Sequence, residues 1–190
     1  KMLLAYDGTE YAGWQAQPAH RTIQGEVERV IHELTGEKVR VHSSGRTDRG
    51  VHAHAQAAHF DLEKPVILRK FLLGCNALLK EDIRVYSIAK APASFHARYA
   101  VTEKEYRYFI WNGPVMPPAL RHQRALVRPR LDVAAMNRAA QLLVGQNDFA
   151  AFSANPNREI DGTVRHLRGL VASRRGREIT IVARGDGFLY

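Results

Sequence analysis

Segments with the hydrophobic spacing of helices alternate along this chain with short segments typical of strands. The order of these segments limits the fold more than any single residue does. Apolar residues recur at helical spacing in segments that predict helices over residues 22–36, about 65–79 and about 132–144. Short apolar or alternating runs between these segments predict strands. A strand, a helix and further strands follow one another in each half. We therefore expect an α+β protein of two similar halves, residues 1–97 and 98–190, each with an antiparallel or mixed sheet packed by helices.

The boundaries of these elements are predicted from capping and turn residues. Thr22 can cap the first helix, and Gly36 and Gly145 can end the first and the last. The predicted strands are KMLLAYDG, VRVHSSG, AQAAHFDL, IRVYSIAKA, KEYRYFIWN, TVRHLRGLVAS and REITIVARG. The segment SSGRTDRGVHAHAQ, from Ser43 to Gln56, is predicted to be a loop between two of them.

The charge of the chain indicates a polyanionic partner. It has 28 basic and 19 acidic residues, a formal net charge of +9 and a sequence pI near 10. Most of the excess is arginine, whose planar fork suits phosphate and can stack on bases. Two clusters contain Arg121, Arg124, Arg128 and Arg130, and Arg165, Arg168, Arg174, Arg175 and Arg177. The alternative is an ordinary solvated basic surface.

Cysteine content and hydropathy exclude two classes of protein. Cys75 is the only cysteine, so an intramolecular disulfide framework is impossible and a reducing compartment is the default. The apolar runs around residues 65–73 are interrupted by Arg69 and Lys70, far short of the roughly 20 residues that span a bilayer. The first residues lack a signal-peptide pattern. We expect a soluble, cytoplasmic protein with no membrane segment.

One carboxylate in the predicted loop is a candidate reactive group. Gly45 and Gly50 enclose Asp48, with Arg46 and Arg49 beside it. Glycines allow a positive φ and a sharp turn that can present one side chain, and we expect Asp48 to point into a cleft. Two guanidinium groups favour its ionised form, so it would act as an anion or nucleophile and not as a general acid. The alternative is an aspartate that caps its own turn.

Histidines near this loop raise the question of a metal site. His52 and His54 alternate in a probable strand, with His42 and His59 nearby. A zinc site needs three or four placed ligands, and the later half of the chain adds no Cys or His pair with ligand spacing. We therefore expect no metal, and histidines that are structural or contact RNA.

A second candidate is an aromatic residue in the predicted strand KEYRYFIWN. Tyr106, Tyr108 and Ile110 share one face of this strand, and one face should be core. An aromatic side chain at a sheet surface could stack on a flipped base. The alternative is that Tyr106 is an ordinary core residue.

The segment GRTDRGVHA, residues 45–53, resembles the catalytic motif of the tRNA pseudouridine synthases that modify the anticodon stem-loop. Further segments resemble successive blocks of that family in the same order: AYDGTEYAGWQAQP, TIQGEVERVI, SFHARYAVTEKEYRYFIWN, NDFAAFS and GDGFLY. The resemblance implies the pseudouridine synthase fold and an isomerase that needs no cofactor. Its implied reaction converts uridine to pseudouridine at positions 38–40 of the tRNA anticodon stem-loop.

The same resemblance implies roles for three residues. Asp48 matches the essential aspartate, which would attack either the anomeric carbon of the sugar or the ring. Arg46 matches an arginine implied to fill the space left by the flipped nucleotide and to pair with the acid. Tyr106 matches a tyrosine implied to pack on the target ring and to help remove the C5 proton. The family works as a homodimer that grips tRNA, which predicts the same assembly here.

The sequence departs from the family after GDGFLY. Family members continue with a segment resembling His-Met-Val-Arg and a further helical region, whereas this chain ends at Tyr190. The arginine of that segment is implied to pair with the catalytic aspartate. We therefore expect a loosened site and a weakened dimer in the chain as given.

Two other functions stay open from the sequence. A non-catalytic RNA-binding module would bind tRNA tightly without releasing the C5 proton. A metal-dependent phosphoesterase built on His52, His54 and Asp48 would be sensitive to chelators.

Overall fold

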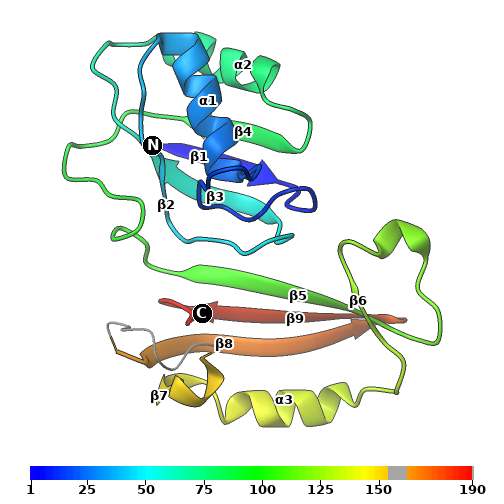
Figure 1. The fold of residues 1–190 in the computed structure, drawn as a ribbon. Helices are drawn as coiled ribbons and strands as arrows, with labels where there is room; N and C mark the ends of the chain where they lie inside the picture. The colour runs from blue at the N-terminus through cyan, green and yellow to red at the C-terminus, as the bar shows by residue number, and fades with distance from the viewer. Residues whose placement is uncertain (154–161, 190) are drawn as a thin grey trace. The chain divides into compact units, whose positions relative to one another are not determined.

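The chain folds into two compact units, Lys1–Val101 and Thr102–Tyr190. The structure is a computed structural model that describes residues 1–153 and 162–189. Each unit combines a sheet with helices, which confirms the predicted α+β class (Figure 1). In the described residues, no helix has the length and apolar character needed to cross a membrane.

Unit 1 is a four-stranded antiparallel sheet with two helices on one face (Figure 1). The strand order is β2-β3-β1-β4. The strands are β1 (Met2–Tyr6), β2 (His42–Ser43), β3 (Ala53–His59) and β4 (Ile83–Ile88), and the helices are α1 (Ile23–Thr35) and α2 (Leu68–Leu78). The residues of β1 alternate, so that Met2, Leu4 and Tyr6 are buried.

Helix α1 forms as predicted because its ends and its apolar face are encoded locally. The Thr22 hydroxyl accepts a hydrogen bond from the Gly25 backbone N–H at 3.2 Å, and Gly36 ends the helix with a left-handed φ of 77°. The buried apolar residues of the helix are Ile23, Val27, Val30 and Ile31.

Unit 2 is a five-stranded mixed sheet in the order β6-β5-β9-β8-β7. The strands are β5 (Lys104–Asn112), β6 (Ala125–Val127), β7 (Gly145–Asp148), β8 (Val164–Arg175) and β9 (Glu178–Gly185). Strands β5 and β6 are parallel, and the other pairs are antiparallel. Helix α3 (Val133–Gln141) runs along one face of this sheet, and short 3-10 turns occupy Pro118–Leu120 and Ala150–Phe152 (Figure 1).

Several predicted boundaries were wrong. Helix α2 begins at Leu68 and not near Pro65, and helix α3 ends at Gln141 and not near Val144. Gly145 has a φ of 111° but begins strand β7, which the sequence did not indicate. Strand β6 and both 3-10 turns were also missed. Strands β6 and β7 depend on pairing with other strands, and all of these elements are too short to carry a periodicity of their own.

The predicted loop from Ser43 to Gln56 was too long at both ends. Ser43 belongs to β2, and Ala53 already belongs to β3 because it pairs with Tyr6 of β1. The connecting loop is therefore residues 44–52. We call this segment the motif loop.

Candidate active site

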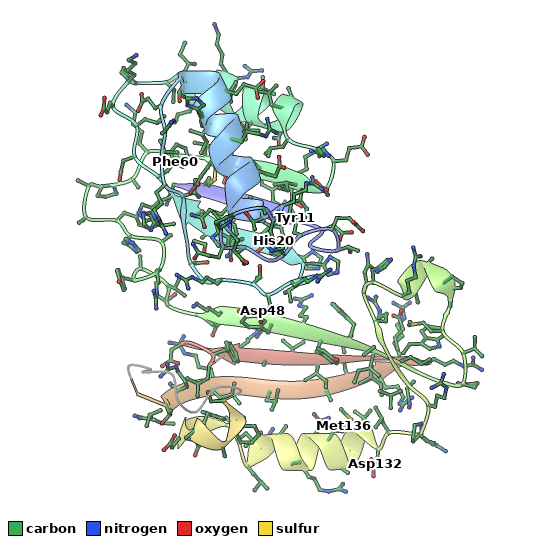
Figure 2. The ribbon with its side chains drawn as sticks, in the orientation of Figure 1. Tyr11, His20, Asp48, Phe60, Asp132 and Met136 are labelled. Carbon is green, nitrogen blue, oxygen red and sulfur yellow. The ribbon has the colours of Figure 1, made fainter. Side chains whose placement is uncertain are left out.

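The motif loop carries Asp48 at the end of unit 1 where β2 leads into β3 (Figure 2). Asp48, Arg46 and Arg49 all lie exposed to solvent. The structure thus brings Arg46 and Asp48 into one short loop. That Asp48 points into a cleft stays a prediction.

A tight turn shapes the loop directly after Asp48. The Val51 backbone N–H donates to the Asp48 carbonyl at 3.1 Å, and Gly50 takes a φ of 78°. Gly45 contributes through its carbonyl oxygen, which accepts hydrogen bonds from the Ser43 hydroxyl and the Gln56 side-chain amide. The two glycines therefore have different roles: the Gly45 carbonyl accepts hydrogen bonds, and Gly50 forms the turn.

A second loop, residues 7–14, packs directly against the motif loop through two glycines. A Cβ on Gly8 would lie 2.1 Å from the Val51 carbonyl oxygen, and one on Gly13 would lie 2.7 Å from the Thr47 carbonyl oxygen. Gly13 also has a φ of 100°. Neither position has room for a side chain. The sequence did not indicate either contact, because Gly8 and Gly13 are distant from Val51 and Thr47 along the chain.

Hydrogen bonds also join the two loops. The Trp14 backbone N–H donates to the Thr47 carbonyl at 2.9 Å, and the Thr47 hydroxyl lies 2.9 Å from the Tyr6 hydroxyl in a hydrogen bond. The Gly50 N–H donates to the Tyr11 carbonyl at 3.4 Å. Residues on both sides of Asp48, Thr47 and Gly50, are thus hydrogen-bonded to strand β1 or to the second loop.

Tyr11, labelled in Figure 2, belongs to a polar network with Arg21 and Asp82. Its hydroxyl donates to the Asp82 carboxylate at 2.6 Å and accepts from the Arg21 guanidinium at 2.6 Å. Arg21 also pairs with Asp82 at 3.1 Å. Burial, followed by the Asp82 hydrogen bond and charge, raises the pKa of Tyr11 far above its usual value. The phenol therefore stays protonated and keeps donating to Asp82.

The two histidines next to the loop, His52 and His54, differ in their surroundings. His52 precedes β3, and its Nδ1 lies 3.0 Å from the Asp7 carboxylate, whereas His54 is exposed on β3. The prediction that both alternate within one strand was therefore wrong, because β3 begins at Ala53. Within residues 1–153 and 162–189, no group of three or more His, Cys, Asp or Glu side chains is arranged to hold a metal ion.

A second histidine cluster lies at the other end of β2 and β3. His42 and His59 pair across the two strands with ring centroids 5.1 Å apart, and the His96 ring lies 4.5 Å from that of His59. The Ala97 N–H donates to His59 Nδ1 at 3.2 Å. Burial lowers the pKa of His59, and His96 and His42 lower it further. His59 is thus a buried, hydrogen-bonded structural residue.

Tyr106 lies in unit 2, on strand β5. Its side chain is 41% exposed, and its ring meets Phe188 edge-to-face at a centroid distance of 4.8 Å. Tyr108 is also exposed and Ile110 is buried, so only one end of this strand face is core. Tyr106 therefore presents an accessible aromatic ring, and it belongs to a different unit from Asp48 and Arg46.

Most arginines of the two basic clusters lie on the surface of unit 2. The exposed members are Arg121, Arg128, Arg130, Arg168, Arg174, Arg175 and Arg177. Arg174 uses part of its guanidinium to donate to Asn112 and to the Leu131 carbonyl, both at 2.8 Å. Arg168 pairs with Glu103 at 3.6 Å, and the charges of the remaining exposed arginines suit an anionic partner.

Comparisons with known proteins agree on one family. A family model described as tRNA pseudouridine synthase matches residues 2–100. A protein named tRNA pseudouridine synthase A from Brevibacillus brevis is 43% identical over 191 residues, which cover 100% of this chain and 78% of that protein. The protein of the same name from Geobacter sulfurreducens is 43% identical over 189 residues, covering 100% of this chain and 77% of its own length. The one from Halalkalibacterium halodurans is 43% identical over 188 residues, covering 98% and 71%.

Proposed function

This chain belongs to the tRNA pseudouridine synthase family, and we propose that Asp48 is its catalytic aspartate. The protein is an isomerase that converts uridine to pseudouridine in tRNA. The observation that carries the assignment of Asp48 is its place in the segment GRTDRGVHA, on a loop that unit 1 holds by backbone and side-chain contacts. Binding and catalytic groups are commonly presented in this way, on a loop held by a rigid scaffold.

We propose that the target uridines are at positions 38–40 of the anticodon stem-loop. The resemblance of the motifs supports this choice. The net charge of +9 and the exposed arginines of unit 2 suit the phosphate backbone of tRNA. A uracil within a helix must be extruded before its glycosidic bond can be reached, at a cost of a few kcal/mol.

The reaction balances without any co-reactant. The bond between N1 and the anomeric carbon breaks, the ring turns, and C5 forms a bond to the same carbon. The hydrogen of C5 leaves as a proton, and N1 ends with a proton. Substrate and product have the same atoms and oxidation level, so the prediction of no cofactor is chemically consistent.

Asp48 would act as an anion at one of two places. Attack on the anomeric carbon would resemble the way carboxylates assist glycosidic cleavage through oxocarbenium-like states. Attack on the ring would form an adduct to the base instead. The exposed position of Asp48 leaves its carboxylate accessible to either atom.

Arg46 and Tyr106 complete the proposed site. Arg46 would occupy the space of the extruded nucleotide and pair with Asp48, which lies two residues further along the same loop. Tyr106 would pack its exposed ring on the uracil and help to remove the C5 proton. Stacking of a base on an aromatic side chain is worth roughly 1 to 3 kcal/mol.

We also propose that the protein acts as a homodimer in the cytoplasm. The resemblance to a dimeric family supports the first point, and the tRNA substrate with the single, buried Cys75 supports the second. Measuring the molecular mass of the protein in solution, with and without tRNA, tests whether it is a homodimer.

The decisive experiment measures the release of tritium from tRNA labelled at uridine C5. We expect Asp48→Asn to abolish release while tRNA binding stays nearly unchanged, because the amide keeps the shape of the side chain but loses its charge. Asp61→Asn is the matched control, since Asp61 is also exposed in unit 1 but lies outside the motif loop. Normal release from Asp48→Asn would overturn the assignment. Tight binding without release by the unaltered protein would favour a non-catalytic RNA-binding module.

A further inference from the structure

Thr47, the residue before Asp48, is held at two points by the packed part of unit 1. Its carbonyl oxygen accepts from the Trp14 N–H, and its hydroxyl is hydrogen-bonded to the Tyr6 hydroxyl, both at 2.9 Å. Tyr6 and Trp14 are 4% and 2% exposed, and their rings lie 6.1 Å apart in the core. A contact therefore runs from the core of the sheet to the residue that precedes the proposed nucleophile.

We propose that Tyr6 and Thr47 are positioning residues, and that their hydrogen bond aims the Asp48 carboxylate. This inference rests on the proposed role of Asp48. The backbone torsions of Thr47 set the direction in which the Cα–Cβ bond of Asp48 leaves the chain. Holding both the hydroxyl and the carbonyl of Thr47 prevents its peptide unit from rotating, so Asp48 starts from a fixed direction.

The surroundings of Thr47 leave the loop little space to shift. Gly13 approaches so closely that an added Cβ would lie 2.7 Å from the Thr47 carbonyl oxygen and 3.2 Å from the Asp48 carbonyl carbon. Close packing on this side blocks inward movement of the loop. Movement away from the core would break the bond between Tyr6 and Thr47. The hydrogen bond between the two hydroxyl groups thus restricts outward movement of the loop, and the close approach of Gly13 restricts inward movement.

The proposed chemistry explains why a fixed position of the Asp48 carboxylate is useful. A group that only attracts phosphate tolerates displacement, because its Coulomb energy falls slowly with distance. A nucleophile must lie close to the productive geometry, and a displacement of about 1 Å can cost on the order of 100-fold in rate. Loss of the hydrogen bond between Tyr6 and Thr47 should therefore lower turnover more than it weakens tRNA binding.

The test uses Tyr6→Phe and Thr47→Val, alone and combined, in the tritium-release assay. We expect each single change to lower kcat roughly 10- to 100-fold, with KM changed less than about 3-fold. The double variant should be no slower than the slower single variant, because both changes remove the same contact. Thr47→Ser keeps the hydroxyl and should retain most of the rate.

Two controls separate this role from general structural damage. Tyr86→Phe removes a tyrosine hydroxyl from an exposed position on β4 and should leave kcat unchanged. Thermal unfolding of each variant gives the folded fraction with which kcat is corrected. A purely structural role would lower the melting temperature and leave the corrected kcat at its normal value, and that result would overturn the proposal.

Asp48→Asn in the same assay distinguishes failure of the positioning role of Tyr6 and Thr47 from failure of the proposed catalytic role of Asp48. If Asp48→Asn is inactive but Tyr6→Phe turns over normally, the positioning role is wrong and the proposed function stands. If Asp48→Asn is active, the proposed role of Asp48 fails and this inference fails with it. Effects of Tyr6→Phe and Thr47→Val that multiply in the double variant would also contradict the proposal, since they would be independent.

Discussion

The two units of this chain bury their side chains to different degrees. Unit 1 has a core cluster of large side chains, and Leu4, Ile23 and Ile31 are completely inaccessible to solvent. Among the described residues of unit 2, the buried hydrophobic side chains are Ile110, Ala140, Leu167, Ala172 and Ile179. The same unit exposes large side chains, which are Tyr106, Tyr108, Val115, Leu142, Phe152, Val164 and Val171.

Helix α3 leaves an apolar space against the sheet of unit 2. Between this helix and the sheet lies a hollow of about 270 Å³. Its lining is apolar and consists of Met136, Ala139, Ala140, Leu143, Leu170, Ala172 and Ile181. Figure 2 shows Met136 on this helix, one turn after Asp132. Several of these lining side chains, including Met136, Leu143, Leu170 and Ile181, are thus only partly buried.

This difference matches the tasks that we propose for the two units. A nucleophile needs a rigid scaffold, and the motif loop lies on the unit with the larger core. An aromatic ring that packs on an extruded base must be accessible, and Tyr106 lies on the unit that exposes more of its large side chains. The comparison therefore predicts that equivalent changes should have unequal effects in the two units.

The largest expected effect is the truncation of a core side chain in unit 1. Ile31→Ala should lower the free energy of unfolding of unit 1 by about 2 to 5 kcal/mol, because it leaves a cavity in a fully buried site. Leu142→Ala is the comparison in unit 2, at one of the large side chains that this unit exposes. It should cost no more than about 0.5 kcal/mol, since that side chain is 81% exposed.

The two tryptophans allow each unit to be followed separately. Trp14 lies in unit 1 and Trp111 in unit 2, and the chain has no other tryptophan. Unfolding in urea is monitored by Trp14 fluorescence in a Trp111→Phe background for changes in unit 1, and by Trp111 fluorescence in a Trp14→Phe background for changes in unit 2. Similar losses from Ile31→Ala and Leu142→Ala would contradict the difference in burial between these two side chains.

A smaller effect is expected where a methyl group is added at a glycine. Gly8→Ala should cost about 1 to 3 kcal/mol in unit 1 and lower tritium release, because the new Cβ would overlap the Val51 carbonyl and displace the motif loop. Gly169→Ala in unit 2 meets nothing within 4 Å and should be nearly neutral. Normal activity in Gly8→Ala would show that the second loop does not hold the motif loop in place.

The smallest effect is a difference in acid sensitivity. The pKa of His59 is lowered in the folded protein, whereas an unfolded histidine titrates near about 6.5. Below that pH the unfolded chain binds more protons than the folded one, so this contribution to stability is present above about pH 6.5 and is lost as the pH falls. His42 and His96 oppose protonation of His59, and Asp61 favours it.

Unit 2 should respond in a different pH range. Its lowered pKa values belong to exposed carboxylates, which are Glu105, Asp132 and Asp148. Their contributions are present above about pH 4 and are lost below it. Between about pH 7.5 and 5.5 we expect the urea midpoint of unit 1 to fall more than that of unit 2, and His59→Gln to reduce the fall. An unchanged fall in His59→Gln would assign the acid sensitivity to other groups.

Much of unit 1 could be predicted because its signals are local. Thr22 and Gly36 cap helix α1, and the apolar spacing between them defines the buried face. The motif loop was recognisable from its glycines and from its resemblance to one family. Helix α3 was predicted to begin at about Asp132, which the structure shows to be its N-cap, but the predicted end near Val144 lies three residues beyond Gln141.

The sequence by itself determined the α+β class, the family, and Asp48, Arg46 and Tyr106 as the proposed site residues. Only the tertiary structure decided what holds Asp48 in place. Tyr6 and Thr47 are 41 residues apart, and Gly8 meets Val51 across a similar distance along the chain. Such contacts depend on the register of β1 against β3 and on the packing of two loops. Local periodicity cannot encode them, because a pattern along the chain reports the neighbours of a residue in sequence and not its neighbours in space.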